Sequence, residues 1–322
     1  MQFKSYNQPV SDLRKPPMAT VFCAVWHKQA DKLDLLRSHW ENLKAQSLPV
    51  EACYIFDNGD EAPDWLDATW HSFSEPLTIY EAWAAGVALS NTKYTMNLNM
   101  DDRLATDAVR MMVSTAEATQ SALVAGDWLV SFDKSHLNAE FTVTDLWGTH
   151  HSPEWPLMAQ PNLRLGSGSG DRGTFGPATL WNLDILGKWY PTHFNNNTPI
   201  QSIGDQIFWK VVLQNKQKAT RLPLIIGRYF SDTNSQAEFR PHNDNAFLKT
   251  YGVNPVSFAQ CVTSGDFSKR PGQAGAALDA EARDAAAPEA LNAVEQASAQ
   301  LAEKFRAAGL GAGAGPTPGI SR

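Results

Sequence analysis

The residue types most capable of chemistry lie in the stretch 94–103. Apolar and β-favouring residues alternate at its start, and Asp101-Asp102 follow where this strand pattern stops. Open α/β sheets place their ligand crevice at such strand ends. Two adjacent carboxylates repel each other, and Mn²⁺ or Mg²⁺ would remove that repulsion while sharing its coordination with a ligand phosphate. The pair could instead cap a helix that begins near Ala105, because Asp is a favoured N-cap residue.

Segments with the periodicity of strands and helices surround this stretch. Strands are predicted at 19–26, 51–56, 69–73, 94–98 and 122–130, and helices at 31–45, 80–89 and 105–119. This order predicts an α/β sandwich with a mostly parallel central sheet. The carboxyl ends of parallel strands meet at one edge, so Asp57, after the second strand, is expected near His27, after the first.

The second half of the chain begins with a long segment without periodicity, 133–173. Loops of that length are usually functional or disordered, and we expect a mobile segment that covers a substrate. Beyond it, helices are predicted at 182–186, 203–214 and 246–251, and a strand at 222–230. Asp205 interrupts the apolar face of the longest of these helices near its start. Three tryptophans are expected in the core: Trp181, Trp189 and Trp209.

Composition predicts a globular protein and excludes some classes. The chain has 322 residues, is 43% hydrophobic, and carries 27 Lys+Arg against 34 Asp+Glu, so we expect no nucleic-acid partner. Cys23 and Cys53 lie in apolar, strand-like runs typical of buried free thiols. The sequence shows neither a signal peptide nor an apolar segment of the ~20 residues that span a bilayer. These features predict a cytoplasmic protein, and peripheral association with a membrane stays open.

Shifts in composition predict the domain boundaries. Residues 1–17 are expected to be a disordered lead-in, 18–262 the folded domain, and 263–287 a linker. The segment 288–308 is rich in Ala and Glu, with apolar positions at helical spacing, and predicts a C-terminal helix that could contact a partner. The last residues, 309–322, are nearly all Gly, Ala and Pro and predict a disordered tail.

Several motifs in this order resemble the family 2 glycosyltransferases with the GT-A fold, of the nucleotide-diphospho-sugar transferase superfamily. The matching segments are 56–59 (FDNG), 79–87 (IYEAWAAGV), 97–102 (NLNMDD), 124–127 (VAGD), 176–181 (GPATLW) and 204–205 (GD). The resemblance covers residues 18–251 and rests on the order and spacing of the motifs. It implies a Rossmann-like α/β/α sandwich and an inverting, hexosyl-type glycosyltransferase.

The resemblance also implies a site for a nucleotide-sugar donor, of the UDP or GDP type, at the carboxyl edge of the sheet. At the matching positions, Asp57 would contact the base and His27 would border the same pocket. Asn99 and Asp101 would face the ribose.

The resemblance further implies a cation on the diphosphate. Asp102, with Asp101, would hold Mn²⁺ or Mg²⁺, although the family often has Asp where this chain has Asn99. Arg240 and His242 could reach the diphosphate or the metal, because Arg suits phosphate geometry. Both residues could equally belong to a solvated loop.

Asp205 matches the position of the family's catalytic base. An acceptor hydroxyl, on a glycan, a lipid-linked compound or another molecule, would attack the anomeric carbon from the face opposite the nucleotide while a carboxylate takes its proton. In the family this base normally belongs to an acidic pair, and Gly204 replaces the first member here.

Each assignment has an alternative. Asp57 beside Asn58-Gly59 could only shape a turn, and Asp205 could only be an N-cap or first-turn carboxylate. A nucleotidyltransferase on the same fold would need a Gly-rich phosphate loop after the first strand, where the chain has no glycine. A non-catalytic protein that binds nucleotide-sugars or glycans stays possible because Asn99 and Gly204 replace acidic residues.

Overall fold

The computed structural model describes residues 1–8, 16–131, 173–174, 178–230 and 243–272. All of them except Gly272 belong to one unit, Met1–Pro271. The predicted covering loop, Arg240, His242 and the predicted C-terminal helix and tail lie outside the described residues. In the described part of the chain, no helix is long and apolar enough to cross a membrane.

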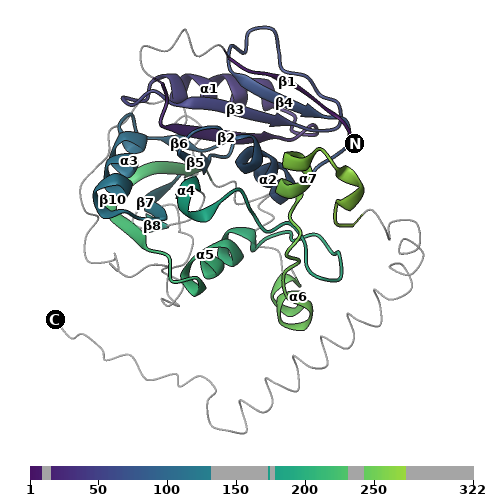
Figure 1. The fold of residues 1–322 in the computed structure, drawn as a ribbon. Coiled ribbons are helices and arrows are strands. Elements are labelled where there is room, and N and C mark those ends of the chain that lie inside the picture. Colours follow the sequence, from purple (N-terminus) through teal and green to yellow (C-terminus); the bar gives the residue numbers. More distant parts are fainter. Residues whose placement is uncertain (9–15, 132–172, 175–177, 231–242, 273–322) are drawn as a thin grey trace, which may run out of the picture. The chain divides into compact units, whose positions relative to one another are not determined.

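A mixed sheet forms the centre of this unit (Figure 1). In the described residues its order is β1-β4-β3-β2-β5-β9-β7-β10-β6, with β8 beside β7. The strands are β1 (Phe3–Tyr6), β2 (Ala19–Val25), β3 (Glu51–Phe56), β4 (Thr69–Phe73), β5 (Tyr94–Asn97), β6 (Arg103–Leu104), β7 (Leu123–Ser131), β8 (Gly173–Thr174), β9 (Leu180–Asn182) and β10 (Ala219–Phe230). Strands β4, β3, β2 and β5 pair in parallel, as do β7 and β10, and β9 lies antiparallel between the two groups. The predicted α/β class with a mostly parallel sheet is confirmed.

Helices cover both faces of the sheet. The helices are α1 (Lys32–Lys44), α2 (Ile79–Leu89), α3 (Ala108–Thr119), α4 (Leu183–Leu186), α5 (Gly204–Gln214), α6 (Asp244–Tyr251), α7 (Phe258–Ser264) and the 3-10 helix η6 (Phe267–Lys269). Apolar side chains of α1 and α3 share one core cluster, and those of α2, α5 and α7 share the other. The result is the predicted α/β/α sandwich.

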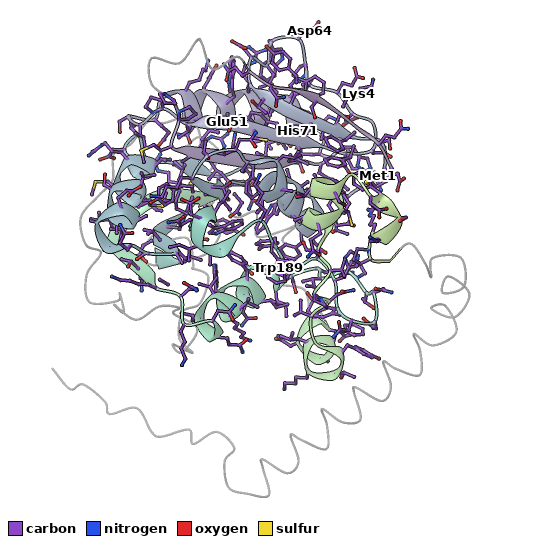
Figure 2. All side chains as sticks on the ribbon, in the orientation of Figure 1. Met1, Lys4, Glu51, Asp64, His71 and Trp189 are labelled. Atoms are coloured by element: carbon purple, nitrogen blue, oxygen red, sulfur yellow. The ribbon has the colours of Figure 1, made fainter. Side chains whose placement is uncertain are left out.

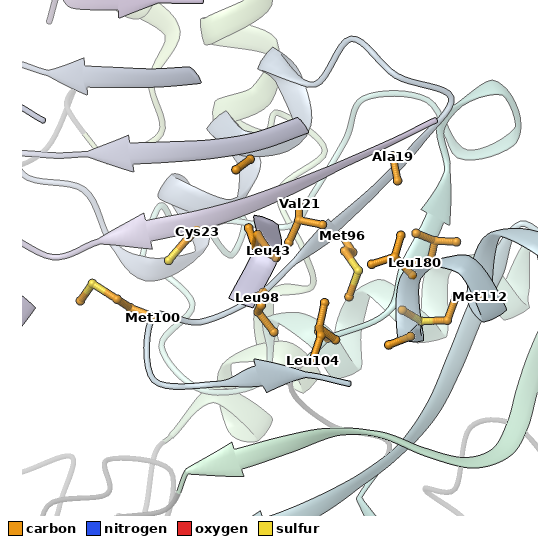
Figure 3. Close-up of a cluster of buried hydrophobic side chains, with 14 of the residues drawn as sticks. Ala19, Val21, Cys23, Leu43, Met96, Leu98, Met100, Leu104, Met112 and Leu180 are labelled. Carbon is orange, nitrogen blue, oxygen red and sulfur yellow. The ribbon is translucent and has the colours of Figure 1, made fainter. Parts of the chain in front are cut away.

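The alternation of side chains along β2 builds the two clusters. Ala19, Val21 and Cys23 belong to the cluster with α1 and α3, whereas Phe22 belongs to the other. Figure 3 shows Ala19, Val21 and Cys23 in the cluster with α1 and α3. On the opposite face α2 approaches β2 closely, since a Cβ added at Gly86 would lie 2.4 Å from the Phe22 ring. The sandwich therefore depends on a small residue at this crossing. The cysteines predicted to be buried are buried free thiols.

The prediction of a disordered lead-in over 1–17 is wrong for its first residues. Residues 3–6 form the edge strand β1, which pairs antiparallel with β4. Figure 2 labels Lys4 on this strand and His71 on its neighbour. The Phe3 ring stacks on Phe73, with 4.9 Å between ring centroids. A four-residue strand is too short for its period to be detected in the sequence, and pairing with β4 and stacking on Phe73 order it. Residues 9–15 lie outside the described part.

The predicted boundary at 262 is also wrong, because the folded unit continues to Pro271. Arg270 anchors this extension to α2. Its guanidinium donates to both carboxylate oxygens of Glu81, to Oε1 at 2.7 Å and to Oε2 at 3.0 Å. It also donates to Glu75 Oε2 at 3.0 Å. Glu81 is almost fully buried and also accepts the N–H of Thr78, which completes the capping box of α2. The predicted boundary followed a shift in composition toward Gly and polar residues, but the contacts of Arg270 keep the chain folded beyond that shift.

Replacing Arg270 with Met should lower the free energy of unfolding by about 3 kcal/mol, because it leaves the buried Glu81 carboxylate without its bidentate partner. Urea denaturation measures this loss. The matched control is Lys4→Met, which breaks an exposed pair with Glu61 and should leave the free energy of unfolding unchanged within error. Equal effects of the two substitutions would contradict an anchoring role for Arg270.

Candidate functional site

The carboxyl ends of β2 and β3 bring His27 and Asp57 into direct contact, as the parallel topology predicts. Asp57 is buried, and its carboxylate accepts the backbone N–H of His27 at 3.0 Å and that of Leu77 at 3.1 Å. The ring atom Nδ1 of His27 lies 2.8 Å from Asp57 Oδ2. Because an ionised carboxylate only accepts hydrogen bonds, Nδ1 carries a proton. Asp57 thus fixes the orientation of the His27 ring.

Asp57 also begins a tight turn, so the structural alternative for this residue holds in part. Its carbonyl accepts the N–H of Asp60, and the two residues between them adopt left-handed conformations, with φ of 56° at Asn58 and 77° at Gly59. Asn and Gly tolerate this conformation best. The turn and the contact with His27 are compatible functions of one side chain.

The acidic stretch after β5 is a turn and not a helix cap. Helix α3 begins at Ala108 with Asp107 at its N-cap, so the helix start predicted near Ala105 is wrong. The intervening residues 103–104 form β6, which pairs with β10. The N–H of Asp102 donates to the carbonyl of Asn99 at 3.0 Å and closes the turn. The alternative in which Asp101-Asp102 cap the helix is thereby excluded.

The two carboxylates of this turn differ in environment. Asp101 is partly exposed, as is Asn99, whereas Asp102 is fully buried. Asp102 Oδ1 accepts the N–H of Phe230, at the end of β10, at 3.3 Å. Burial and the charge of Asp101 raise the pKa of Asp102 well above its usual value, although the Phe230 N–H and nearby polar groups act in the opposite direction.

Arg103 holds the backbone of the turn by hydrogen bonds, and this role was not predicted from the sequence. The side chain is 1% exposed and donates to the carbonyls of Met100 at 2.9 Å and Asp102 at 2.6 Å. It also donates to Ser38 Oγ at 3.2 Å and to the carbonyl of Leu35 at 3.4 Å. One guanidinium therefore joins the acidic turn to α1. Its positive charge opposes the rise in the pKa of Asp102.

The turn fits a cation that is shared with a ligand. Asp102 Oδ2 is buried and has no hydrogen-bond partner, which is costly for a carboxylate oxygen unless something pairs with it. Mg²⁺ is typically held by one or two carboxylates together with substrate phosphates. Among the described residues no cluster of three or more potential ligands occurs, so the turn is not a complete metal cage by itself.

Asp205 lies in the first turn of α5 and borders a small, narrow pocket. The pocket is lined by Trp83, Asn97, Thr179, Trp181, Tyr190, Asp205, Phe208 and Trp209. Burial raises the pKa of Asp205 to about 6, and the N–H of Gln206, at 2.7 Å from Oδ1, partly offsets this rise. The N-cap of α5 is Ile203, so Asp205 is not the cap. A carboxyl group with this pKa can accept a proton near neutral pH.

Gly204 has a packing reason to lack a side chain. A Cβ at this position would lie 2.7 Å from the ring of Tyr80 on α2. An acidic residue here would therefore displace Tyr80 from the second core cluster. The chain can accommodate one carboxylate at the start of α5, and not the acidic pair.

The prediction of tryptophans in the core is confirmed for Trp181 and Trp209 but not for Trp189, which only packs against the second core cluster. Trp181 and Trp209 are buried, and Trp181 stacks on Tyr190 with 5.3 Å between ring centroids. Trp189 is partly buried and donates to the carbonyl of Pro255 at 3.2 Å. The rings of Trp181, Tyr190 and Trp209 line the pocket that Asp205 borders.

Asn97 and Thr179 line the pocket that Asp205 borders, and neither was predicted from the sequence as a site residue. The alternation in β5 carries the signal for Asn97, because Met96 and Leu98 belong to the cluster with α1 and α3 and Asn97 must face α2 and α5. Thr179 accepts a hydrogen bond from the Trp181 indole and precedes β9. No local pattern marks it.

Comparisons with known proteins add a distant likeness of fold. No protein-family model and no curated protein matches the sequence. The structure of S. aureus TarS 1–349 in complex with UDP-GlcNAc aligns with 81% of this chain and 75% of that chain, at 8% identity and a TM-score of 0.49. Its complex with UDP aligns with 66% of this chain at 10% identity and a TM-score of 0.44, and this chain spans 60% of that structure's length.

Proposed function

We propose that this protein is a glycosyltransferase that moves a sugar from a nucleotide-diphosphate sugar to an acceptor hydroxyl with inversion. The observation that carries the proposal is the end of β5. Asn97, the last residue of this strand, lines the pocket of Asp205, and the acidic turn follows within five residues. This arrangement supports a proton-accepting group and a cation-holding group on either side of one strand end.

The donor site of this proposal uses the carboxyl edge of the sheet. The His27–Asp57 pair and the acidic turn flank β2, because β3 and β5 are its two neighbours. His27 and Asp57 would contact the base, and Asn99 and Asp101 the ribose. A UDP- or GDP-type donor fits these polar groups, and Arg240 would contact its phosphates.

Asp101 and Asp102 would hold Mn²⁺ or Mg²⁺, with His242 as a further ligand. The buried, unpartnered Oδ2 of Asp102 supports this assignment. A bound cation would stabilise the negative charge that develops on the leaving diphosphate. Arg103 would keep the backbone of the turn in place during this step, since it donates to two of the turn's carbonyls.

Asp205 would act as the general base. The acceptor hydroxyl oxygen attacks the anomeric carbon and forms the new glycosidic bond while its proton moves to the Asp205 carboxylate. The bond between the anomeric carbon and the diphosphate oxygen breaks, and its electron pair leaves with the nucleoside diphosphate. Attack from the face opposite the leaving group inverts the anomeric configuration. The raised pKa of Asp205 suits it to this proton transfer.

The acceptor class in this proposal is a glycan, a lipid-linked compound or another hydroxyl compound. Such a reaction belongs to polysaccharide or glycoconjugate biosynthesis, in the cytoplasm or at a membrane surface. The segment 288–308 would contact a partner.

A non-catalytic protein that binds nucleotide-sugars or glycans is the second candidate. The observation that favours it is the replacement of two acidic residues, by Asn99 in the turn and by Gly204 beside Tyr80. A nucleotidyltransferase has less support, because the connection between β2 and α1, residues 26–31, has no glycine to cradle a triphosphate.

A donor screen tests the proposal. The purified protein is incubated with UDP- and GDP-sugars in Mn²⁺, and slow release of UDP or GDP by hydrolysis is measured. We expect release from one donor and loss of that release in excess EDTA. Binding of a nucleotide without release from any donor, with or without candidate acceptors, would favour the non-catalytic candidate.

A further inference from the structure

The helix that carries Asp205 does not fix its own start. Its N-cap, Ile203, has no side chain that can cap the helix. Asp205 Oδ1 accepts the N–H of the next residue, Gln206, which is a local bond. The first turn of α5 is therefore held by packing, at Gly204 against Tyr80, and by whatever holds the residues just before it.

Asp244 holds these residues from another element. Its Oδ2 atom accepts the N–H of Gln201 at 3.0 Å, the N–H of Ser202 at 2.7 Å and the hydroxyl of Ser202 at 3.1 Å. The side chain is 96% shielded from solvent and comes from α6, more than forty positions along the chain. Three converging donors on one buried carboxylate oxygen define the path of the backbone that enters α5.

The ordinary explanation for an acid at the start of a helix does not account for these bonds. Asp244 is in the first turn of α6, where a carboxylate favours the helix dipole. The N-cap of α6 is Asn243, without a side-chain cap, and the hydrogen bonds of Asp244 go to residues 201–202. The carboxylate is thus used to join two segments.

We propose that Asp244 is a positioning residue for Asp205. This inference rests on the proposed function, in which Asp205 is the general base. By fixing residues 201–202, Asp244 would fix the first turn of α5 and aim the Asp205 carboxylate into its pocket. A displacement of about 1 Å at such a group can reduce a rate about a hundredfold.

The other end of α6 supplies a matched control. Asn195 Nδ2 donates to the carbonyl of Tyr251 at 2.7 Å, and the N–H of Asn195 donates to the carbonyl of Gly252 at 3.1 Å. Asn195 is exposed and belongs to the same segment that leads into α5. Asn195→Ala therefore weakens the docking of α6 without touching the contact at residues 201–202.

The test compares Asp244→Ala, Asp244→Asn and Asn195→Ala by hydrogen exchange, by the rate at saturating donor and by UDP affinity. We expect Asp244→Ala to speed amide exchange at residues 204–208 at least about tenfold and to lower the rate at least about thirtyfold, with UDP affinity unchanged within about twofold. Asp244→Asn keeps an acceptor oxygen and should restore the rate to within about threefold of the original. Asn195→Ala should speed exchange only near residues 248–252.

Unchanged exchange at residues 204–208 in Asp244→Ala, or equal acceleration there in Asn195→Ala, would overturn the inference. The exchange measurement does not depend on turnover. If Asp205→Asn were fully active, the base assignment would fail while the exchange result still decided whether Asp244 holds the start of α5.

Discussion

Asp205→Asn should lower the transfer rate about a thousandfold and leave nucleotide affinity unchanged. Removal of a general base typically costs a factor of about 10²–10⁴, and the amide cannot take the acceptor's proton. The substitution should not lower the melting temperature at pH 8, because it replaces an ionised carboxylate whose charge burial disfavours. Steady-state kinetics and UDP titration measure the two effects.

The matched control is Asp184→Asn, which changes an exposed first-turn carboxylate of α4. We expect the transfer rate of Asp184→Asn to equal that of the original protein. Full activity of Asp205→Asn, or equal losses in both variants, would remove Asp205 from the role of base.

The pH dependence of the transfer rate also tests Asp205 as the general base. The base must be ionised to act, and burial raises the pKa of Asp205 to about 6. Activity should therefore be present above pH 6 and fall about tenfold for each pH unit below it. A profile that stays flat down to pH 4.5 would contradict a base with this pKa.

Arg103→Met should lower the free energy of unfolding by about 3–5 kcal/mol, the largest stability effect we expect in the site. The guanidinium is buried and donates to three backbone carbonyls and one hydroxyl, which would lose their donors together. The loss should also weaken UDP binding in Mn²⁺, because Arg103 holds two carbonyls of the acidic turn. Urea denaturation and calorimetry measure these changes.

Arg110→Met is the control for this prediction. Arg110 is exposed and pairs with Asp107 on the surface of α3, so its loss should change stability by about 0.5 kcal/mol or less. An Arg103→Met variant that matches the control in stability and in nucleotide binding would show that the buried network does not support the turn.

Periodicity predicted the elements that position the site and the contact between His27 and Asp57. The strands at β2, β3 and β5 are apolar enough to be recognised, and parallel pairing puts their carboxyl ends at one edge. The sequence alone could not decide whether Asp101-Asp102 bind a ligand or cap a helix. The answer depends on residues 103–104, which pair with β10 as strand β6 and separate the two carboxylates from α3.

Contacts between distant positions could not be predicted. Arg103 reaches Ser38 across 65 positions, and Arg270 reaches Glu81 across 189. The absence of a side chain at Gly204 has its cause in Tyr80, on another helix. Sequence periodicity reports which face of an element is apolar, and it contains no information about which polar groups meet across such separations.

Calorimetric titration with UDP and GDP tests whether the carboxyl edge of the sheet binds a nucleoside diphosphate through a cation. We expect one of the two nucleotides to bind in Mn²⁺, with affinity at least about tenfold weaker in EDTA and in Asp101→Asn. The exposed control Asp64→Asn should bind as the original does. Absence of binding by either nucleotide in Mn²⁺, with the protein folded, would show that this edge of the sheet is not a nucleotide site.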